Sequence, residues 1–527
     1  MKTIILANAR VHTFDPRKPH AEAVVVQDGV ILDAGPSTEI INHFGDDAEI
    51  IDMQDNTVLP GLTDSHLHLL EYGLSLQRIR CDFLSFDECL NLVRKEAERA
   101  VPGEWVLGHG WDQNLWKGKS PSIEDFDRSA PDNPVYLSHK SLHSAWANSA
   151  AMQKAGITAG TDDPPGGRFG RNKEGVLSGI LYESAMRMVE NVIPAPDRNV
   201  KKKSLLKAQD QLLKFGITCV HDFDQWEILP LLQEMEAEEE LYIRVVKGIP
   251  RDELDAVIEQ GMKSGDGSHR VIIGWLKLFA DGALGTETAA MLDPYENSSS
   301  TGMLFMDADE VTEIGRKALE NGISPAVHAI GDRANREVIS GFEKLSVDGL
   351  FRKTGFVPRI EHVQIIESID RERMARAGIA ASVQPIHAIS DREMAEEKWG
   401  SRCRDAYAWK SIHDAGALLS FGSDAPVESP NPYWGLYASI KRKPIESSNK
   451  KSGWYPDQKL SLDQALNAYI PNPHITAGNA AGGKIIPGNR ADLVVIPGDI
   501  YDMENEEIKD IIPAKVITGG QWLMDVN

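Results

Sequence analysis

The chain of 527 residues has no hydrophobic run of the roughly 18 residues that a membrane-spanning helix requires. Its first residues, MKTIILANARVHTFD, hold only a short apolar stretch that runs into an alternating pattern, so no signal peptide is predicted. Cysteine is also scarce, because the four cysteines have neither metal-ligand nor redox spacing. A chain this long with so few cysteines is typical of reduced proteins, and we expect a cytoplasmic protein without a membrane anchor.

Positive charge is in deficit, with 56 lysines and arginines against 79 acidic residues and a net charge of −23. Such a chain has no basic face to meet phosphates, so no nucleic-acid partner is expected. Nucleotide motifs are missing too: Gly118-Lys119-Ser120 resembles the end of a phosphate loop, but Gln113 stands where that motif needs glycine. We expect a small-molecule substrate, and a homodimer is an assembly that the sequence leaves open.

Short alternating segments at both ends predict strands, joined by turns at Asp28-Gly29 and Gly519-Gly520. They lie at residues 3–6, 23–27, 30–34, 492–496, 516–518 and 521–524. Because chain ends often lie close together, we predict one small β-sandwich built from residues 1–56 and 485–527.

Between the two ends, short apolar runs alternate with helical patterns, as parallel βα units require. Eight such runs predict a (β/α)₈ barrel over residues 57–484, an α/β fold. The strands are expected at residues 57–62, 218–222, 243–247, 275–279, 324–328, 359–362, 381–384 and 418–422. Residues 69–203 are too long for one crossover, so they are predicted to form an inserted subdomain.

The strongest local signal is VLPGLTDSHLHL, in which His66 and His68 stand two residues apart beside a predicted strand. Residues two apart in extended backbone point to the same face, so both imidazoles can reach one metal ion. Two surface histidines in a loop are the alternative. Three further groups weaken it, because His328, His362 and Asp424 each follow another predicted strand, and the carboxyl ends of barrel strands converge on one site.

Lys277 lies on a predicted strand whose alternation, in GWLKLFADGALG, can point its side chain into the barrel. A buried ammonium beside metal cations is costly. One solution is reaction with carbon dioxide, which gives a carbamate that bridges two metals. The alternative is a neutral lysine, or one paired with Asp281 on the same face.

These residues resemble the amidohydrolase superfamily, and particularly its YtcJ-like branch, which includes N-substituted formamide deformylases. The motifs that carry the resemblance cover nearly the whole chain: VLPGLTDSHLHL, GHGWDQNLW, HSAWANSAAM, DPPGGRFG, KLFADGALG, VHAIGDRA, RIEHVQ, FGSDAPV and GNRADLVVI. The resemblance implies a barrel with a small β-domain and hydrolysis at a carbon centre, usually an amide. Its implied metal positions are His66, His68, Lys277, His328, His362 and Asp424.

Weaker candidates for substrate contact are Trp111, Asp112 and Arg168, through the family motifs, and His143, His387 and Asp281 through their positions. A second metal site at His139 and His143, or a fifth histidine ligand at His221, is less favoured than structural packing. The expected cofactor is a divalent metal, zinc first, with one or two ions per chain.

Three functions follow. The first is hydrolysis of an amide-type, non-peptide carbon–nitrogen bond, with Asp424 as proton shuttle. The second keeps the site but changes the bond to a lactone, ester or phosphotriester, or to deamination. The third, a non-catalytic metal-binding protein, is disfavoured because the ligand set is complete.

Overall fold

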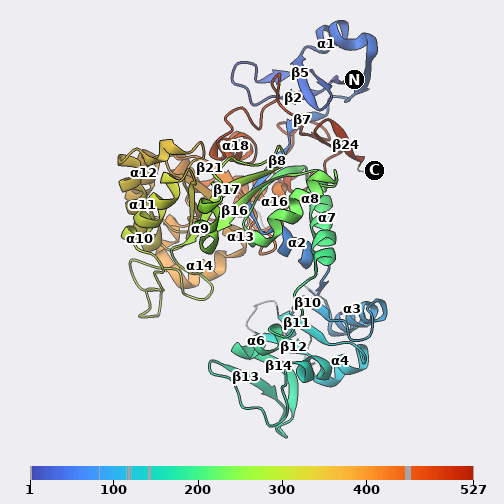
Figure 1. Ribbon diagram of the computed structural model, residues 1–527, viewed down its shortest axis with the longest axis vertical. Coiled ribbons are helices and arrows are strands. Elements are labelled where there is room, and N and C mark those ends of the chain that lie inside the picture. Colours follow the sequence, from blue (N-terminus) through green and yellow to red (C-terminus); the bar gives the residue numbers. More distant parts are fainter. Residues whose placement is uncertain are drawn as a thin grey trace. The chain divides into compact units, whose positions relative to one another are not determined.

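The computed structural model describes residues 3–81, 84–113, 116, 119, 121–139, 144–445 and 453–525. The chain divides into two compact units (Figure 1). One comprises Met1–Tyr72 and Leu205–Asn527, and the other comprises Gly73–Ser204. The bounds of the second unit lie near those of the insertion predicted at residues 69–203, whose assignment as an inserted subdomain stays a prediction. Within the described residues, no helix combines the length and the apolar character needed to cross a bilayer.

Eight parallel strands form the central sheet of the first unit. In sheet order they are β8 (Leu62–Leu67), β15 (Ile217–Asp222), β16 (Arg244–Pro250), β17 (Val271–Phe279), β18 (Pro325–Ala329), β19 (Arg359–His362), β20 (Ala380–Val383) and β21 (Leu419–Phe421). Residues at the two ends of this order also meet, because the N–H of Asp424 donates to the carbonyl of His66 at 2.7 Å. The sheet is thus an almost closed barrel.

The first barrel strand was predicted too early, at residues 57–62. The structure places Thr57–Pro60 in a separate strand, β7, which pairs with β22 (Leu493–Ile496) outside the barrel. The chain changes sheets at Gly61, where a Cβ atom would lie 2.1 Å from Thr218 Oγ1. Only glycine allows that approach to β15. The other seven predicted strands overlap β15 to β21.

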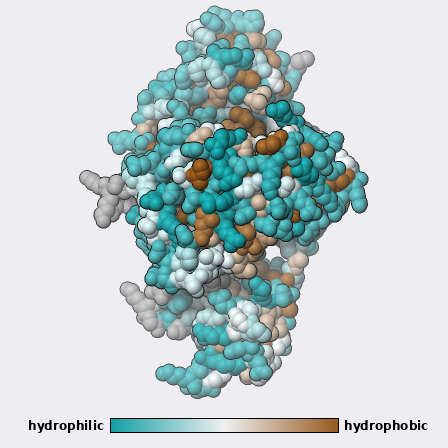
Figure 2. Space-filling model, turned by 90° about the vertical axis from the view of Figure 1, so that its left-hand side faces the viewer, coloured by the Kyte–Doolittle hydropathy of each residue, from teal (hydrophilic) through white to brown (hydrophobic). Residues whose placement is uncertain are grey.

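Helices between the strands bury one apolar side each. The buried positions of α11 (Asp332–Val347) include Ala334, Val338, Phe342 and Leu345, which recur at the helical spacing. The other helices of this unit are α1 (Ser37–Phe44), α2 (Leu69–Ser75, which extends past Tyr72), α8 (Leu229–Ala237), α9 (Leu254–Glu259), α10 (Ala308–Glu320), α12 (Ser368–Ala377), α13 (His387–Ser390), α14 (Arg392–Trp399), α15 (Trp409–Asp414), α16 (Pro432–Lys441), α17 (Leu462–Tyr469) and α18 (Pro471–Thr476). Figure 2 shows hydrophilic side chains over most of the face on the α10–α12 side, with hydrophobic ones in scattered patches.

Two smaller sheets contain the strands near the chain ends. The first consists of β5 (Val30–Gly35), β4 (Ala23–Gln27), β1 (Thr3–Ala7) and β6 (Ala48–Asp52). The second consists of β24 (Gln521–Asp525), β23 (Lys515–Thr518), β22, β7, β2 (Arg10–His12) and β3 (His20–Ala21). Buried side chains of both sheets, such as Leu6 and Val495, belong to one hydrophobic cluster. The assignment of residues 1–56 and 485–527 to one β-sandwich domain stays a prediction.

The described residues of the second unit form a six-stranded sheet and several short to medium helices. The strands in order are β13 (Gly167–Arg171), β14 (Leu177–Glu183), β12 (Ser144–Ala147), β11 (Val135–His139), β10 (Val106–Trp111) and β9 (Ile79–Arg80). The helices are α3 (Phe86–Arg99), α4 (Ile123–Ser129), α5 (Ser149–Lys154) and α6 (Ser184–Glu190), and α7 (Arg198–Lys214) continues into the first unit.

Candidate metal centre

Three side chains at the ends of barrel strands bring potential metal-binding atoms together. His66 lies on β8, His362 ends β19, and Asp424 follows β21. One ligand atom from each lies within 4.8 Å of the others, and the two histidines are buried. Among the described residues, this is the group of three histidine, cysteine or acidic side chains that could hold an ion.

The backbone leaves the extended conformation at two of these residues. His362 has φ of 75° and Asp424 has φ of 62°, both in the left-handed region. Residues other than glycine adopt this region at a cost of roughly 1–3 kcal/mol, and such residues cluster at functional sites. In a regular strand, neighbouring residues such as Glu361 and His362 point to opposite faces of the sheet. The left-handed φ of His362 ends this alternation, so its side chain need not point to the face opposite Glu361.

His68 lies beside the three-residue group. Its Nε2 atom is 3.5 Å from Asp424 Oδ1, and the Nε2 atom of His66 is 3.6 Å from the same oxygen. Both histidines of the H-x-H pair therefore face Asp424. Burial lowers the pKa of His68, but interactions with Asp224 and Asp424 outweigh it and raise that pKa to about 10.

Hydrogen-bond partners select the free nitrogen of two imidazoles. His66 Nδ1 lies 2.6 Å from Glu361 Oε2, and His362 Nδ1 lies 2.8 Å from Gln384 Oε1. A carboxylate only accepts, so the Nδ1 of His66 carries the proton and Nε2 keeps its lone pair. Burial lowers the pKa of His66 to about 4 and the pKa of His362 well below its ordinary value. Both imidazoles are then neutral near pH 7, which metal binding requires.

His328 and Lys277 lie next to this group. The ring of His328 is 4.6 Å from that of His362, but its Nε2 is 3.0 Å from the carbonyl of Gly282, which leaves Nδ1 available. Lys277 is buried, with Nζ 4.8 Å above the Phe223 ring. Burial lowers the pKa of Lys277 to about 8, against the opposing influence of nearby carboxylates.

A buried ion pair next to the site was not predicted from the sequence. Arg359 Nε donates to Glu361 Oε1 at 2.6 Å, and neither side chain is exposed. Its only signal in the sequence is a pair of charged residues, two positions apart, on a predicted barrel strand. Asp64 was not predicted either, and its carboxylate accepts from the backbone of His66 and from both the N–H and Oγ of Ser423.

Two candidates for substrate contact lie in the barrel unit. His387 is buried and its ring is nearly parallel to that of His362, with centroids 6.4 Å apart. Asp281 is buried and accepts backbone N–H groups of Ala290, Ile330 and Gly331 at 2.8–3.0 Å. Those bonds hold the loops that follow β17 and β18, so Asp281 has a structural task whatever else it does.

The remaining candidates belong to the second unit. Trp111 lies in its hydrophobic core, 2% exposed, and the indole donates to the carbonyl of Leu137 at 2.9 Å. Asp112 lies 3.9 Å from His139 Nε2, and the guanidinium of Arg168 stacks on Tyr182 at 3.8 Å. His143 lies outside the described residues.

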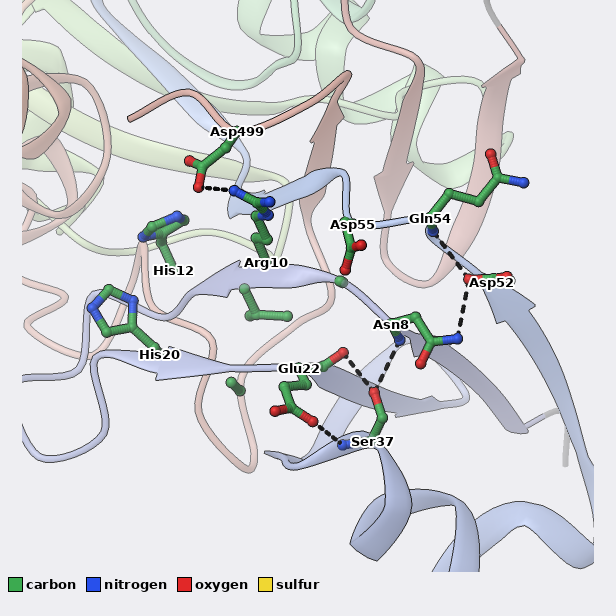
Figure 3. Close-up of a pocket in the computed structure, with 13 residues that line it drawn as sticks. Asn8, Arg10, His12, His20, Glu22, Ser37, Asp52, Gln54, Asp55 and Asp499 are labelled. Carbon is green, nitrogen blue, oxygen red and sulfur yellow. Dashed lines mark hydrogen bonds and ion pairs between the residues drawn. The ribbon is translucent and has the colours of Figure 1, made fainter. Parts of the chain in front are cut away.

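A cavity of about 750 Å³ lies among the N-terminal strands and contains none of the candidate metal ligands. Figure 3 shows that its polar side chains pair largely with one another. Arg10 pairs with Asp499, while the N–H of Asn8 donates to Ser37 Oγ at 2.9 Å. These bonded groups are thus already engaged in holding the strands together.

Comparison with known proteins supports the interpretation of the motifs. The chain is 30% identical to the putative amidohydrolase YtcJ of Bacillus subtilis, over 97% of each chain. It is 27% identical to the N-substituted formamide deformylase of Arthrobacter pascens, over 99% of this chain and 98% of that protein. An uncharacterized metal-dependent hydrolase from Pyrococcus furiosus superposes with a TM-score of 0.77 at 27% identity, covering 96% of this chain and all of that one. The model of the amidohydrolase family matches residues 49–524, and the chain belongs to that family.

Proposed function

We propose that this protein hydrolyses an amide-type, non-peptide carbon–nitrogen bond in a small molecule, at a site built on His66, His362 and Asp424. The observation that carries the proposal is their convergence, with neutral imidazoles and a carboxylate within 4.8 Å of one another. Two imidazole nitrogens and one carboxylate oxygen are one of the donor sets found in catalytic zinc sites, so the residues fit a divalent ion. Such an ion, when bound, supplies Lewis-acid polarisation of a carbonyl and lowers the pKa of water.

Asp424 is the proposed proton shuttle. Burial raises its pKa, but the interaction with His68, which is protonated near pH 7, outweighs burial and holds that pKa well below the ordinary value. The group is therefore a carboxylate that can accept a proton from the attacking water. It then delivers this proton to the leaving nitrogen, which makes an amine a better leaving group.

Lys277 is proposed to carry a carbamate when the metal is bound. Near pH 7 in the metal-free protein, the positive charges of Lys277 and Arg359 offset the negative charges of Glu361 and Asp424, and protonated His68 is offset by Asp224. A divalent ion would add two positive charges to this buried group, which is costly without compensation. Loss of one proton from the ammonium, followed by addition of carbon dioxide to the amine and loss of a second proton, turns the cation into an anion and offsets the two added charges. His68 and His328 then complete the ligand set for one or two ions.

The amide class is favoured over the alternatives by the relative that is named an N-substituted formamide deformylase. The same residues can serve a lactone, ester or phosphotriester, or deamination. Substrate contacts at Trp111, Asp112, His143, Arg168, Asp281 and His387, a cytoplasmic location and a homodimer stay predictions. A non-catalytic role is the least favoured, since every ligand position is filled.

A substrate panel tests the proposal. The zinc-loaded protein is assayed against formamides, acetamides, lactones, carboxyl esters and phosphotriesters whose leaving groups carry the same substituent. The proposal expects turnover of an amide, lost in Asp424→Asn. Turnover confined to lactones, esters or phosphotriesters would assign the site to the second function, and no turnover anywhere by metal-loaded protein would favour the third.

A further inference from the structure

The two imidazoles of the metal group are held by buried acceptors that are not themselves members of the three-residue group. His66 is bonded by Glu361 at 2.6 Å and His362 by Gln384 at 2.8 Å. Glu361 is not exposed at all, and Gln384 is 2% exposed. Each bond uses Nδ1 of the ring, so each ring can offer only Nε2 to an ion.

Glu361 is itself held by a partner that leaves one of its oxygens for His66. Arg359 Nε bonds to Oε1 at 2.6 Å, whereas Oε2 bonds to the imidazole. The guanidinium is fixed at three further places: it bonds to His221 Nδ1 at 2.9 Å, donates to the carbonyl of Ser65 at 3.0 Å, and lies 3.8 Å above the Trp275 ring. A carboxylate tied down in this way cannot rotate away from His66.

We propose that Glu361 and Gln384 are positioning residues that fix the tautomer and the ring direction of His66 and His362, and so set the affinity of the site for its metal. The inference rests on the proposed metal site. Partners of this kind hold ligating histidines in a fixed orientation, and a carboxylate also makes the ring a stronger donor. Because Glu361 carries a charge and Gln384 does not, loss of Glu361 should weaken binding more.

The test is a measurement of metal affinity rather than of activity. Wild-type protein, Glu361→Gln and Gln384→Met are stripped of metal and titrated with zinc against a chromophoric chelator, and the absorption bands of the cobalt-loaded proteins are recorded. Both substitutions are close in size to the original residue. Glu361→Gln is expected to raise Kd by about 10- to 100-fold, with a smaller rise for Gln384→Met and shifted cobalt bands in both.

Asp370→Asn is the matched control. Asp370 is also unexposed and accepts from Arg336 at 2.9 Å and from Arg373 at 2.7 Å, but it lies on the outer helix α12. It is expected to lower the melting temperature and to leave zinc affinity and the cobalt spectrum unchanged. A general loss of packing would instead weaken binding in the control as well, and would overturn the inference.

Other outcomes are equally decisive. If Glu361→Gln fails to fold, Gln384→Met decides alone, because it removes no charge. Kd values within about threefold of wild type in the folded variants, below the range for such partners, would overturn the positioning role and leave the proposed function standing. A wild-type protein that binds no metal at all would contradict the proposed function instead.

Discussion

The main-chain N–H of Asp424 donates to the main-chain carbonyl of His66 at 2.7 Å. This bond joins β8, the first barrel strand, to the residues after β21, the last one. The approach is close because Gly422 has no side chain: a Cβ there would lie 2.5 Å from the nitrogen of His66. The contact that nearly closes the barrel therefore also brings together two residues of the metal group that are far apart in the sequence.

Asp424→Asn separates proton transfer from metal binding. Asparagine is nearly isosteric and keeps an oxygen donor, but it cannot carry the proton, so kcat should fall at least about 100-fold while most of the metal is retained. Rates on the best amide substrate and metal content by elemental analysis check this. A variant with at least about a third of the wild-type rate, far above that scale, would assign the shuttle to another residue.

Lys277 is expected to carry a carbamate when the metal is bound. Protein loaded with metal in the presence of ¹³C-bicarbonate should give a carbamate signal in carbon NMR, and Lys277→Ala should give none. The variant should also lose metal, because the compensating anion is missing. An unmodified Lys277 amine in wild-type protein fully loaded with metal would contradict the proposed carbamate and favour a single ion.

Metal binding should release protons near neutral pH. The pKa of His68 is raised to about 10 and that of Lys277 is about 8 in the metal-free protein, so both are mainly protonated at pH 7. A ligating imidazole or a carbamate must lose its proton, so release should be largest below pH 8 and decline as pH approaches 10. Calorimetric zinc titrations in buffers of different ionisation enthalpy measure it. Heats independent of buffer at pH 7 would mean that neither group becomes a ligand.

Trp111→Ala should destabilise the second unit rather than only alter specificity. The indole is buried in that unit's core and packs against other tryptophans, so truncation should cost roughly 3–5 kcal/mol of unfolding free energy. Arg168→Ala, which removes a stacked guanidinium, is the milder comparison. Thermal unfolding and rates on two unlike substrates distinguish the roles. An unchanged melting temperature with altered substrate preference would support the predicted role of Trp111 in substrate contact.

Sequence patterns predicted seven of the barrel strands because parallel strands buried on both faces are continuous apolar runs. The first strand escaped the pattern, since β8 consists largely of polar residues that are nevertheless buried: Thr63, Asp64, Ser65 and His66. Their burial depends on partners such as Ser423, which are distant in the sequence. The apolar pattern therefore predicted the first barrel strand at β7, which directly precedes β8 in the sequence.

The same limit applies to the site. His66, His362 and Asp424 could be proposed as ligands because each stands at a strand end, and their proximity follows from barrel topology. Glu361 could not be proposed as a positioning residue, because the role of a buried carboxylate depends on its hydrogen-bond partners. Only the fold shows that Arg359 takes one of its oxygens and His66 the other.

Activity is predicted to depend on a metal ion held by His66, His362 and Asp424. The most direct test is to strip the protein with a chelator, confirm metal loss by elemental analysis, and follow amide hydrolysis as zinc is returned, with His362→Ala in parallel. We predict that activity vanishes on stripping, returns in proportion to bound zinc in the wild type, and does not return in the variant. Full activity in protein verified to be free of metal would contradict the predicted dependence of activity on a metal ion.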